Sequence, residues 1–446
     1  MTKIMELPLL GRLLSHWRIV EFGSVLEDGT RNGIYKKKEF HGSGDKIVNM
    51  GELFAHHRLF DIPMKRVQLS DSEQQRFRLQ VGDLLFARRS LVAEGAGKCS
   101  IISEINEPTT FESSIIRARP NHEIADSLYL YYLFRSSYGA YILGSILRHV
   151  AVAGITGTDL VKLLIPLPPL PEQTAIARIL SSLDDKIELN RQMNETLEAI
   201  GQTIFKSWFV NFDPVRAKIE GKQPAGMDAA TAALFPDEFE ESPLGLIPKG
   251  WKVKSLDEIA IFLNGLALQK YLPSSEEYLR VIKITELRKG ITEQSGKATI
   301  DIPSNYIIED GDILFSWSGS LVNCIWCGGK GALNQHLFKV TSTKYPKWFY
   351  YQWVNYHLPE FQFIAAGKAT TMGHIQRHHL KEAKVIVPPL HFLSLVDKKI
   401  SPLIDLIINN NLQSRALATI RDTLLPKLMS GEIRVKEAEK IVEDII

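Results

Sequence analysis

The feature that most constrains this chain is an internal repeat, because the same markers occur twice and in the same order. The matched pairs are Trp17 and Trp251 (251 − 17 = 234), Ile47 and Val281 (281 − 47 = 234), Val81 and Asp310 (310 − 81 = 229), and Pro168–Pro169 and Pro388–Pro389 (388 − 168 = 220). Four matches in series are hardly a product of chance. The second copy is shorter between its Trp and its Pro pair, because the offset falls from 234 to 220. A period far above ~50 residues indicates two tandem copies rather than a solenoid.

Each copy has a globular part followed by a long helix. GDLLFAR from Gly82 and GDILFSW from Gly311 indicate Gly-Asp turns that lead into buried strands. The equivalent segments DSLYLYYLFRSSYGAYIL and PKWFYYQWVNYHL indicate amphipathic helices, whose aromatic rings either pack in the core or stack on bases. We therefore predict an α+β fold: two tandem globular domains, separated by an antiparallel coiled coil of two long helices and related by a pseudo-twofold axis. The predicted parts are globular domain 1–165, helix 166–212, connecting segment 213–249, globular domain 250–387, and helix with C-terminal tail 388–446.

The spacing of apolar residues predicts that the two long helices pair with each other. Apolar positions alternate in steps of four and three, from Ile176 to Trp208 and from Leu393 to Leu428, which is the pattern of a coiled-coil seam. Both seams become polar midway, at Asn190, Asn194, Asn410 and Ser414. In an antiparallel pair these residues meet, and buried polar groups penalise a slip of register, so we predict that Asn190 with Asn410 fixes it. The alternative is two independent surface helices, each on its own globule.

Composition narrows the class of protein. A chain of 446 residues is too long for one ordinary domain, and its net charge of +2 means that any nucleic-acid surface is local. Three cysteines do not make a disulfide framework, so a reducing compartment fits. Because no run approaches about 18 apolar residues, we expect a cytoplasmic protein that does not enter a membrane.

The sequence contains no convincing catalytic or metal-binding motif. Neither Pro-Pro pair belongs to the Asp/Asn-Pro-Pro-aromatic loop that an amino-group DNA methyltransferase needs. GAGKC at Gly95 lacks the first glycine and the Ser/Thr of a phosphate-binding loop. Cys324 and Cys327 form a single CxxC, which a zinc ion would have to complete with distant histidines such as His374 or His378. We therefore expect a chain that is not an enzyme and holds no metal or cofactor.

Two similar globules on a helical spacer suit recognition of a split DNA target. A helix of about 37 residues spans roughly 55 Å, or about 16 base pairs at the outside. Each globule would contact phosphates and base edges in the major groove, although any single cation can also be an ordinary solvated one. The candidate DNA contacts are Lys36, Lys37, Arg88, Arg89, Lys98, Arg148, Lys283, Lys330, Lys368, Thr370, Thr371 and His374.

With these features the chain resembles the specificity subunit of a type I restriction-modification enzyme over nearly its full length. The segments that carry the resemblance are PLPPLPEQTAIARILSSLDDKIELN, IFKSWFVNFDPVRAK, FPDEFEESPLGLIPKGW, GDILFSWSGS and LLPKLMSGEI. Together and in this order they are far more specific than any one alone. One departure is the start of the second helix, where His391-Phe392-Leu393 replaces Pro171-Glu172-Gln173.

The resemblance implies two target-recognition domains that bind a bipartite, asymmetric sequence in double-stranded DNA, with no active site in the subunit itself. It also implies two modification subunits, which carry S-adenosylmethionine and methylate adenine, and two restriction subunits, which use ATP and magnesium. The outward faces of the helices would contact the modification subunits, through apolar residues such as Phe205, Phe209 and Phe212, for which a core role is an equal alternative.

Two other hypotheses remain at this point. The chain could be a self-contained DNA-modifying enzyme with a divergent active site, or a coiled-coil scaffold that binds only protein. The large duplicated globules argue against the scaffold.

Overall fold

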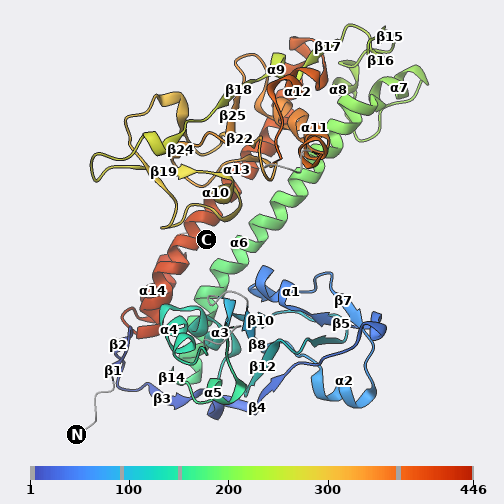
Figure 1. The fold of residues 1–446 in the computed structure, drawn as a ribbon. Coiled ribbons are helices and arrows are strands. Elements are labelled where there is room, and N and C mark those ends of the chain that lie inside the picture. The colour runs from blue at the N-terminus through green and yellow to red at the C-terminus, as the bar shows by residue number, and fades with distance from the viewer. Residues whose placement is uncertain (1–5, 91–94, 149–152, 368–372, 444–446) are drawn as a thin grey trace. The chain divides into compact units, whose positions relative to one another are not determined.

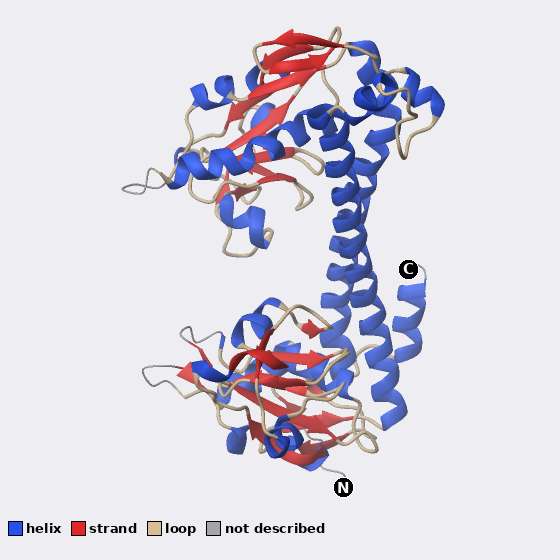
Figure 2. Ribbon diagram, turned by 90° about the vertical axis from the view of Figure 1, so that its right-hand side faces the viewer, coloured by secondary structure: helices blue, strands red, loops and turns tan. Residues whose placement is uncertain are grey.

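The computed structural model describes residues 6–90, 95–148, 153–367 and 373–443 (Figure 1). The chain forms two units: unit 1 comprises residues 1–186 and 417–446, and unit 2 comprises residues 187–416. Both long helices are therefore shared between the units. In each unit the strands gather on one side of its stretch of the helix pair (Figure 2). No helix among the described residues has both the length and the apolar character needed to cross a membrane.

Unit 1 is built on a five-stranded sheet, β4-β12-β8-β10-β6, and a three-stranded sheet, β11-β5-β7. Its helices are α1 (Met50–Ala55), α2 (Asp71–Phe77), α3 (Ser127–Arg135), α4 (Ser137–Ser145), α5 (Gly157–Leu160), the first part of α6 (Leu170–Phe205), the last part of α13 (Leu390–Ser430) and α14 (Val435–Glu443). Its strands are β1 (Glu6–Leu7), β2 (Gly11–Arg12), β3 (Arg18–Glu21), β4 (Leu26–Asn32), β5 (His41–Val48), β6 (Arg58–Leu59), β7 (Lys65–Val67), β8 (Leu84–Ala87), β9 (Arg89–Ser90), β10 (Cys99–Ile102), β11 (Thr109–Phe111), β12 (Ile115–Pro120), β13 (Ala153–Gly154) and β14 (Leu164–Leu167).

Unit 2 is built on two four-stranded sheets, β18-β25-β22-β23 and β20-β19-β24-β21. After α6 the chain continues through a π-helical turn, Lys206–Asn211. The other helices are α7 (Asp213–Ile219), α8 (Ala229–Ala233), α9 (Leu256–Ile259), α10 (Ile284–Lys289), α11 (Lys347–Ala366) and α12 (Arg377–Glu382). The strands are β15 (Phe239–Ser242), β16 (Gly245–Pro248), β17 (Lys252–Ser255), β18 (Ile261–Asn264), β19 (Leu279–Ile282), β20 (Lys297–Ala298), β21 (Ile307–Ile308), β22 (Ile313–Ser316), β23 (Asn323–Ile325), β24 (Gly331–Leu333), β25 (Leu337–Thr341) and β26 (Lys384–Val387).

The repeat found in the sequence is also a repeat of strand pairing. In unit 1, Arg18 of β3 pairs with Leu167 of β14, and in unit 2, Lys252 of β17 pairs with Val387 of β26. The numbers of the equivalent residues differ by 252 − 18 = 234 and 387 − 167 = 220, which are the offsets of the Trp and Pro markers. The central antiparallel pairs β8–β12 and β22–β25 match in the same way. The prediction of two α+β copies is therefore confirmed.

The aromatic-rich segments are helices of the core. Tyr129 and Tyr132 on α3 are fully buried, as are Trp348 and Phe349 on α11, so they are not available to stack on bases. The first copy differs in that its helix is broken, because Ser136 ends α3 and caps α4 by accepting a hydrogen bond from the backbone N–H of Gly139. The connecting segment is ordered rather than loose, and carries α7, α8 and the β15–β16 hairpin.

The two long helices are antiparallel where they meet in unit 2. Asn190 Nδ2 donates to Ser414 Oγ at 3.2 Å, and one turn further along α6, Asn194 Oδ1 accepts from Asn410 Nδ2 at 2.9 Å. Adding 220 to the residue number converts Asn190 into Asn410 and Asn194 into Ser414, so the two contacts are equivalent under a local pseudo-twofold axis. Asn190 Nδ2 also lies 3.4 Å from the backbone oxygen of Asn410. The alternative of two independent surface helices is wrong.

Each globule is fastened to its stretch of the helix pair through a carboxylate. In unit 1, Asp184 of α6 accepts from Arg421 of α13 at 2.6 Å and from the hydroxyl of Tyr132 at 2.7 Å. In unit 2, Asp397 of α13 accepts from the indole N–H of Trp348 at 2.9 Å. These bonds tie α3 and α11, the main helices of the two globules, to the helix pair.

The interpretation of Phe205, Phe209 and Phe212 as an exposed partner-binding face is wrong. Their exposed fractions are 4%, 0% and 5%, and all three belong to the core of unit 2. The ring of Phe209 lies 5.5 Å from that of Trp348, and the ring of Phe205 lies 5.0 Å from that of Trp353. Helix α11 thus covers Phe205 and Phe209, which the coiled-coil pattern places on the side facing away from the partner helix.

We expect Asn410→Ala to lower the free energy of unfolding by about 1–3 kcal/mol, because it removes the donor to the side-chain oxygen of the buried Asn194. Asn409→Ala is the matched control, since Asn409 is exposed on the same helix turn and its loss should stay within about 0.5 kcal/mol. Urea unfolding followed by helical circular dichroism measures both. Equal unfolding midpoints for the two variants would contradict a stabilising role for the amide pair.

Candidate nucleic-acid interface

Two loop clusters occupy equivalent places in the two copies. Cluster 1 consists of residues 88–90, 113–114 and 153–156, which follow β8, precede β12 and precede α5. Cluster 2 consists of residues 317–319, 335–336 and 373–376, which follow β22, precede β25 and precede α12. Each cluster thus lies where two neighbouring strands and the following loop come together.

The backbone of the two clusters is held by the same hydrogen bonds. The N–H of Arg88 donates to the oxygen of Ser114 at 2.8 Å, and the N–H of Trp317 donates to the oxygen of His336 at 3.4 Å. The oxygen of Arg88 in turn accepts from Ile155, as that of Trp317 does from its equivalent residue, Ile375, both at 3.0 Å. The two copies therefore present side chains from one common framework.

The side chains on this framework differ in chemistry. Arg88 donates from its guanidinium to the oxygen of Ser113 at 3.3 Å, whereas Trp317 donates from its indole to the oxygen of Gln335 at 3.1 Å. The strand residue Arg89 pairs with Gly154 in cluster 1. At the corresponding bridge of cluster 2, Ser318 pairs with His374. Cluster 1 is thus basic, and cluster 2 is aromatic and amide-bearing.

A small polar network organises cluster 2. The hydroxyl of Ser318 lies 3.0 Å from His336 Nδ1, and the amide nitrogen of Gln335 lies 3.3 Å from His336 Nε2. The indole ring of Trp317 is half-buried, at 5.8 Å from the ring of His336 and 6.4 Å from that of His374. A second acceptor, the side-chain oxygen of Asn264, holds the indole N–H at 2.9 Å.

Four of the cations predicted from the sequence already have partners. The pairs are Lys36 with Glu73 (2.7 Å), Arg88 with the oxygen of Ser113 (3.3 Å), Lys98 with the oxygen of Phe54 (2.8 Å) and Arg148 with Asp159 (2.6 Å). Burial, together with the charge of Arg135, lowers the pKa of Lys98. The ammonium of Lys98 therefore holds the end of α1.

The remaining candidates are exposed or fall outside the described residues. Lys37, Arg89 and Lys330 are exposed, and their side chains make no hydrogen bond or ion pair with any residue that the structure describes. Lys283 is also exposed, and His374 is half-buried in cluster 2. Lys368, Thr370 and Thr371 lie outside the described residues.

Gln335 and His336 were missed by the sequence analysis. Their signal is the alignment of SSIIRA from Ser113 with QHLFKV from Gln335, at an offset of 335 − 113 = 222. The match is hard to see because only the apolar pattern of the following strand recurs. The first two residues of each segment, which belong to the loop clusters, differ most between the copies.

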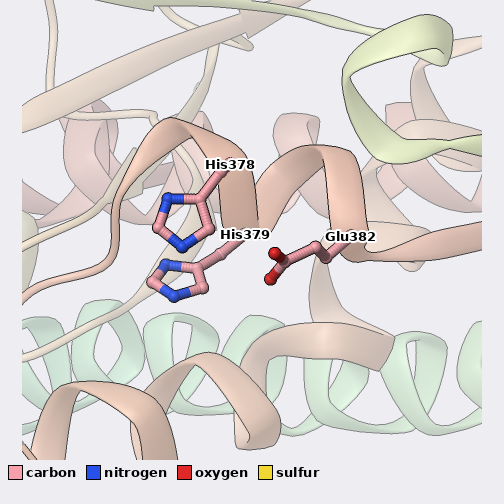
Figure 3. Close-up of side chains that lie close together, drawn as sticks. All are labelled: His378, His379 and Glu382. Atoms are coloured by element: carbon pink, nitrogen blue, oxygen red, sulfur yellow. The ribbon is translucent and has the colours of Figure 1, made fainter.

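One group of side chains could be considered as a metal site. Within the described residues, ligand atoms of His378, His379 and Glu382 on α12 lie within 4.8 Å of one another, and the centroids of the two imidazole rings are 4.0 Å apart with their planes tilted by 44° (Figure 3). However, His379 Nδ1 accepts a hydrogen bond from the backbone N–H of Gln376 at 2.9 Å. An Nδ1 that accepts leaves the proton on Nε2, so this ring caps the helix and is poorly prepared to bind a metal.

We expect His379→Ala to destabilise unit 2 by about 0.5–2 kcal/mol, because it removes a helix cap. His378→Ala, which changes the exposed neighbour, should be nearly neutral. Thermal unfolding with and without zinc measures both effects. A zinc-dependent rise in the melting temperature that both substitutions abolish would contradict the capping interpretation and establish a metal site.

Comparison with known proteins identifies the family to which the chain belongs. The sequence model of the family described as type I restriction modification DNA specificity domain matches residues 15–199 and 248–420, one stretch for each copy. The chain is 25% identical over 441 residues to the specificity subunit of the type I restriction enzyme MjaIX from Methanocaldococcus jannaschii, with 96% of each chain covered. It is 24% identical over 490 residues to the specificity subunit of the type I restriction enzyme HindI from Haemophilus influenzae, covering 94% of this chain and 100% of that protein.

Among solved structures, the fold is similar to the crystal structure of the S subunit of a type I restriction-modification system from M. genitalium. The TM-score is 0.52 at 15% sequence identity, over 92% of this chain and 96% of that chain. At this identity the likeness concerns the fold alone.

Proposed function

Since this chain belongs to the family of type I restriction-modification DNA specificity domains, we propose that its two globular parts each recognise one half of a bipartite target in double-stranded DNA. The chain is a specificity subunit, the non-catalytic DNA-recognition component of a type I restriction-modification complex. A self-contained DNA-modifying enzyme is accordingly not favoured.

The observation that carries the proposal is the pair of loop clusters on one framework. The backbone N–H of Arg88 and that of Trp317 donate to equivalent carbonyls, yet one residue presents a guanidinium and the other an indole. The two copies share the same backbone hydrogen bonds, but their loop side chains differ. Recognition of an asymmetric sequence requires this combination. Arg89 and Lys330, exposed and without partners among the described residues, would contact phosphates or base edges.

The helix pair would set the distance between the two half-sites. α6 contains 36 residues, so its axis is roughly 54 Å long. The amide contacts of Asn194 with Asn410 and of Asn190 with Ser414 would hold the two helices at one register. A slip by one helical turn would change the spacing by roughly 5 Å, or more than one base pair.

The partners of the complex are proposed from the family. Two modification subunits would carry S-adenosylmethionine and methylate adenine, and two restriction subunits would use ATP and magnesium, all in the cytoplasm. A contact surface for the modification subunits is supported by Leu189, Met193 and Ile200, which lie on one face of α6 with exposed fractions of 49%, 40% and 43%. These residues replace the buried phenylalanines as candidates.

We expect DNA from cells that produce this chain with its modification subunits to carry N6-methyladenine in one bipartite motif. Replacing residues 1–165 with the equivalent part of another specificity subunit should change one half of the motif and leave the other half unchanged. Base-resolution methylation sequencing measures the motif. A change in both halves would show that the globular parts do not recognise the halves separately.

We expect Arg89→Ala to weaken DNA binding and to reduce the slope of log K against log salt by about 0.9, the value for one lost phosphate contact. Lys222→Ala is the control, because Lys222 is also exposed but lies in the connecting segment, paired with Glu220. Fluorescence anisotropy at several salt concentrations gives the slopes. Equal slopes for the wild-type chain and Arg89→Ala would remove Arg89 from the phosphate contacts.

A further inference from the structure

We propose that Gln335 is the residue by which the second globular part specifies adenine in its half of the DNA target, with the indole of Trp317 beside it covering an adjacent thymine methyl group. This inference rests on the proposed function and deepens it, because it assigns a base to a side chain. It follows from the hydrogen-bonding state of cluster 2.

The backbone of Gln335 is fixed before any DNA binds. Its N–H donates to the oxygen of Leu266 at 2.9 Å, and its carbonyl accepts from the indole of Trp317 at 3.1 Å. The residue is half-buried and lies two positions before Leu337, the fully buried first residue of β25. A side chain on such a support loses little backbone freedom when it meets a base, which is what a specificity contact needs.

The amide of Gln335 is oriented by a relay through His336. The arrangement that satisfies both distances places the ring proton on Nδ1, donated to the buried hydroxyl of Ser318 at 3.0 Å, and leaves Nε2 to accept from the amide of Gln335 at 3.3 Å. One amide N–H is thereby used. The side-chain oxygen and the second N–H of Gln335 have no partner among the described residues.

One acceptor beside one donor is the complement of adenine. In the major groove adenine presents its N6 amino group as donor and N7 as acceptor, which an amide engages with two hydrogen bonds. Guanine presents two acceptors, N7 and O6, and would face the amide oxygen with a second oxygen. The free edge of Gln335 therefore selects adenine over guanine.

The indole of Trp317 completes an A·T-directed surface. Asn264 and the carbonyl of Gln335 hold its N–H at 2.9 Å and 3.1 Å, so the ring cannot turn its polar edge toward DNA. What remains accessible of the half-buried ring is apolar surface, on the residue whose indole N–H donates to the backbone oxygen of Gln335. In the major groove the thymine C5-methyl group is the apolar feature that distinguishes a base pair, and an apolar side chain contacts it favourably.

Cluster 1 has no amide beside an indole, and we therefore expect it to select a different base. The position equivalent to Gln335 is Ser113, whose side chain is too short to engage two atoms of one base edge. The exposed side chain of cluster 1 is that of Arg89, and a guanidinium suits the two acceptors of guanine. The same framework would thus select different bases in the two halves of the target.

The test uses the full chain assembled with its modification subunits and a library of duplexes randomised over the target. Wild type should select a bipartite motif that contains an A·T pair in the half recognised by residues 250–387. Gln335→Ala should reduce the preference for that adenine by roughly 5- to 150-fold and leave the other half unchanged. Gln335→Glu keeps the shape of the side chain but offers only acceptors, so the preference should move from adenine to cytosine, whose N4 amino group donates.

Gln294→Ala is the matched control, because Gln294 is exposed elsewhere on the same globular part and its loss should leave the motif unchanged. An unaltered adenine preference in both Gln335 variants, with normal circular dichroism, would overturn the assignment of Gln335. A loss of preference in both halves would also overturn it, because it would indicate a change in the framework. If the wild-type chain selects no bipartite motif at all, the proposed function fails, and this inference with it.

Discussion

The structure depends on the buried amide contacts at the centre of the helix pair. Apolar seams alone allow an antiparallel pair to slide by a heptad, because leucine and isoleucine fill similar holes at several registers. At Asn190, Asn194 and Asn410 a slide would leave buried amides without partners, which costs roughly 1–3 kcal/mol for each group. The penalty acts on every alternative register and not on the native one. We therefore expect the polar residues in the seam to cost some stability and to favour one register of the helix pair.

The turn that precedes the central strand of each globule is shaped by an aspartate in both copies. In unit 1, Asp83 accepts from the backbone N–H of Gln80 at 2.7 Å, and in unit 2 its equivalent, Asp312, accepts from Glu309 at 2.8 Å. Asp312 also pairs with Lys339 at 2.7 Å on the neighbouring strand β25. Residues that shape the backbone have kept their chemistry in both copies, whereas residues that project from the loops have not. Under the proposed function, the framework and the DNA specificity would be carried by different positions of the same repeat.

This division explains which features could be predicted from the sequence. Markers such as Gly82 and Trp17 recur because they satisfy local backbone or packing demands, so the repeat and the α+β copies could be identified from them. The environment of Phe209 could not, because a seam pattern shows which residues face the partner helix but not that α11 covers the other side. Likewise, the partner of Lys98 is the backbone carbonyl of Phe54, 44 residues away. Every residue has a backbone carbonyl, so the sequence does not indicate which one accepts this hydrogen bond. Gln335 escaped notice because it lies where the copies differ.

Joining the two copies in one chain is what permits this difference. A homodimer built on an isologous helix pair would place the same residue at both symmetric positions, so both halves of the target would be contacted by identical side chains. Here the contact of Asn194 with Asn410 is matched by that of Asn190 with Ser414, which has a hydroxyl in place of one amide. The local pseudo-twofold symmetry of the seam is therefore inexact, and the loop residues of the two copies also differ. Under the proposed function, a covalent duplication would retain the symmetric framework of the helix pair and would let the loop residues of the two copies, such as Arg88 and Trp317, differ.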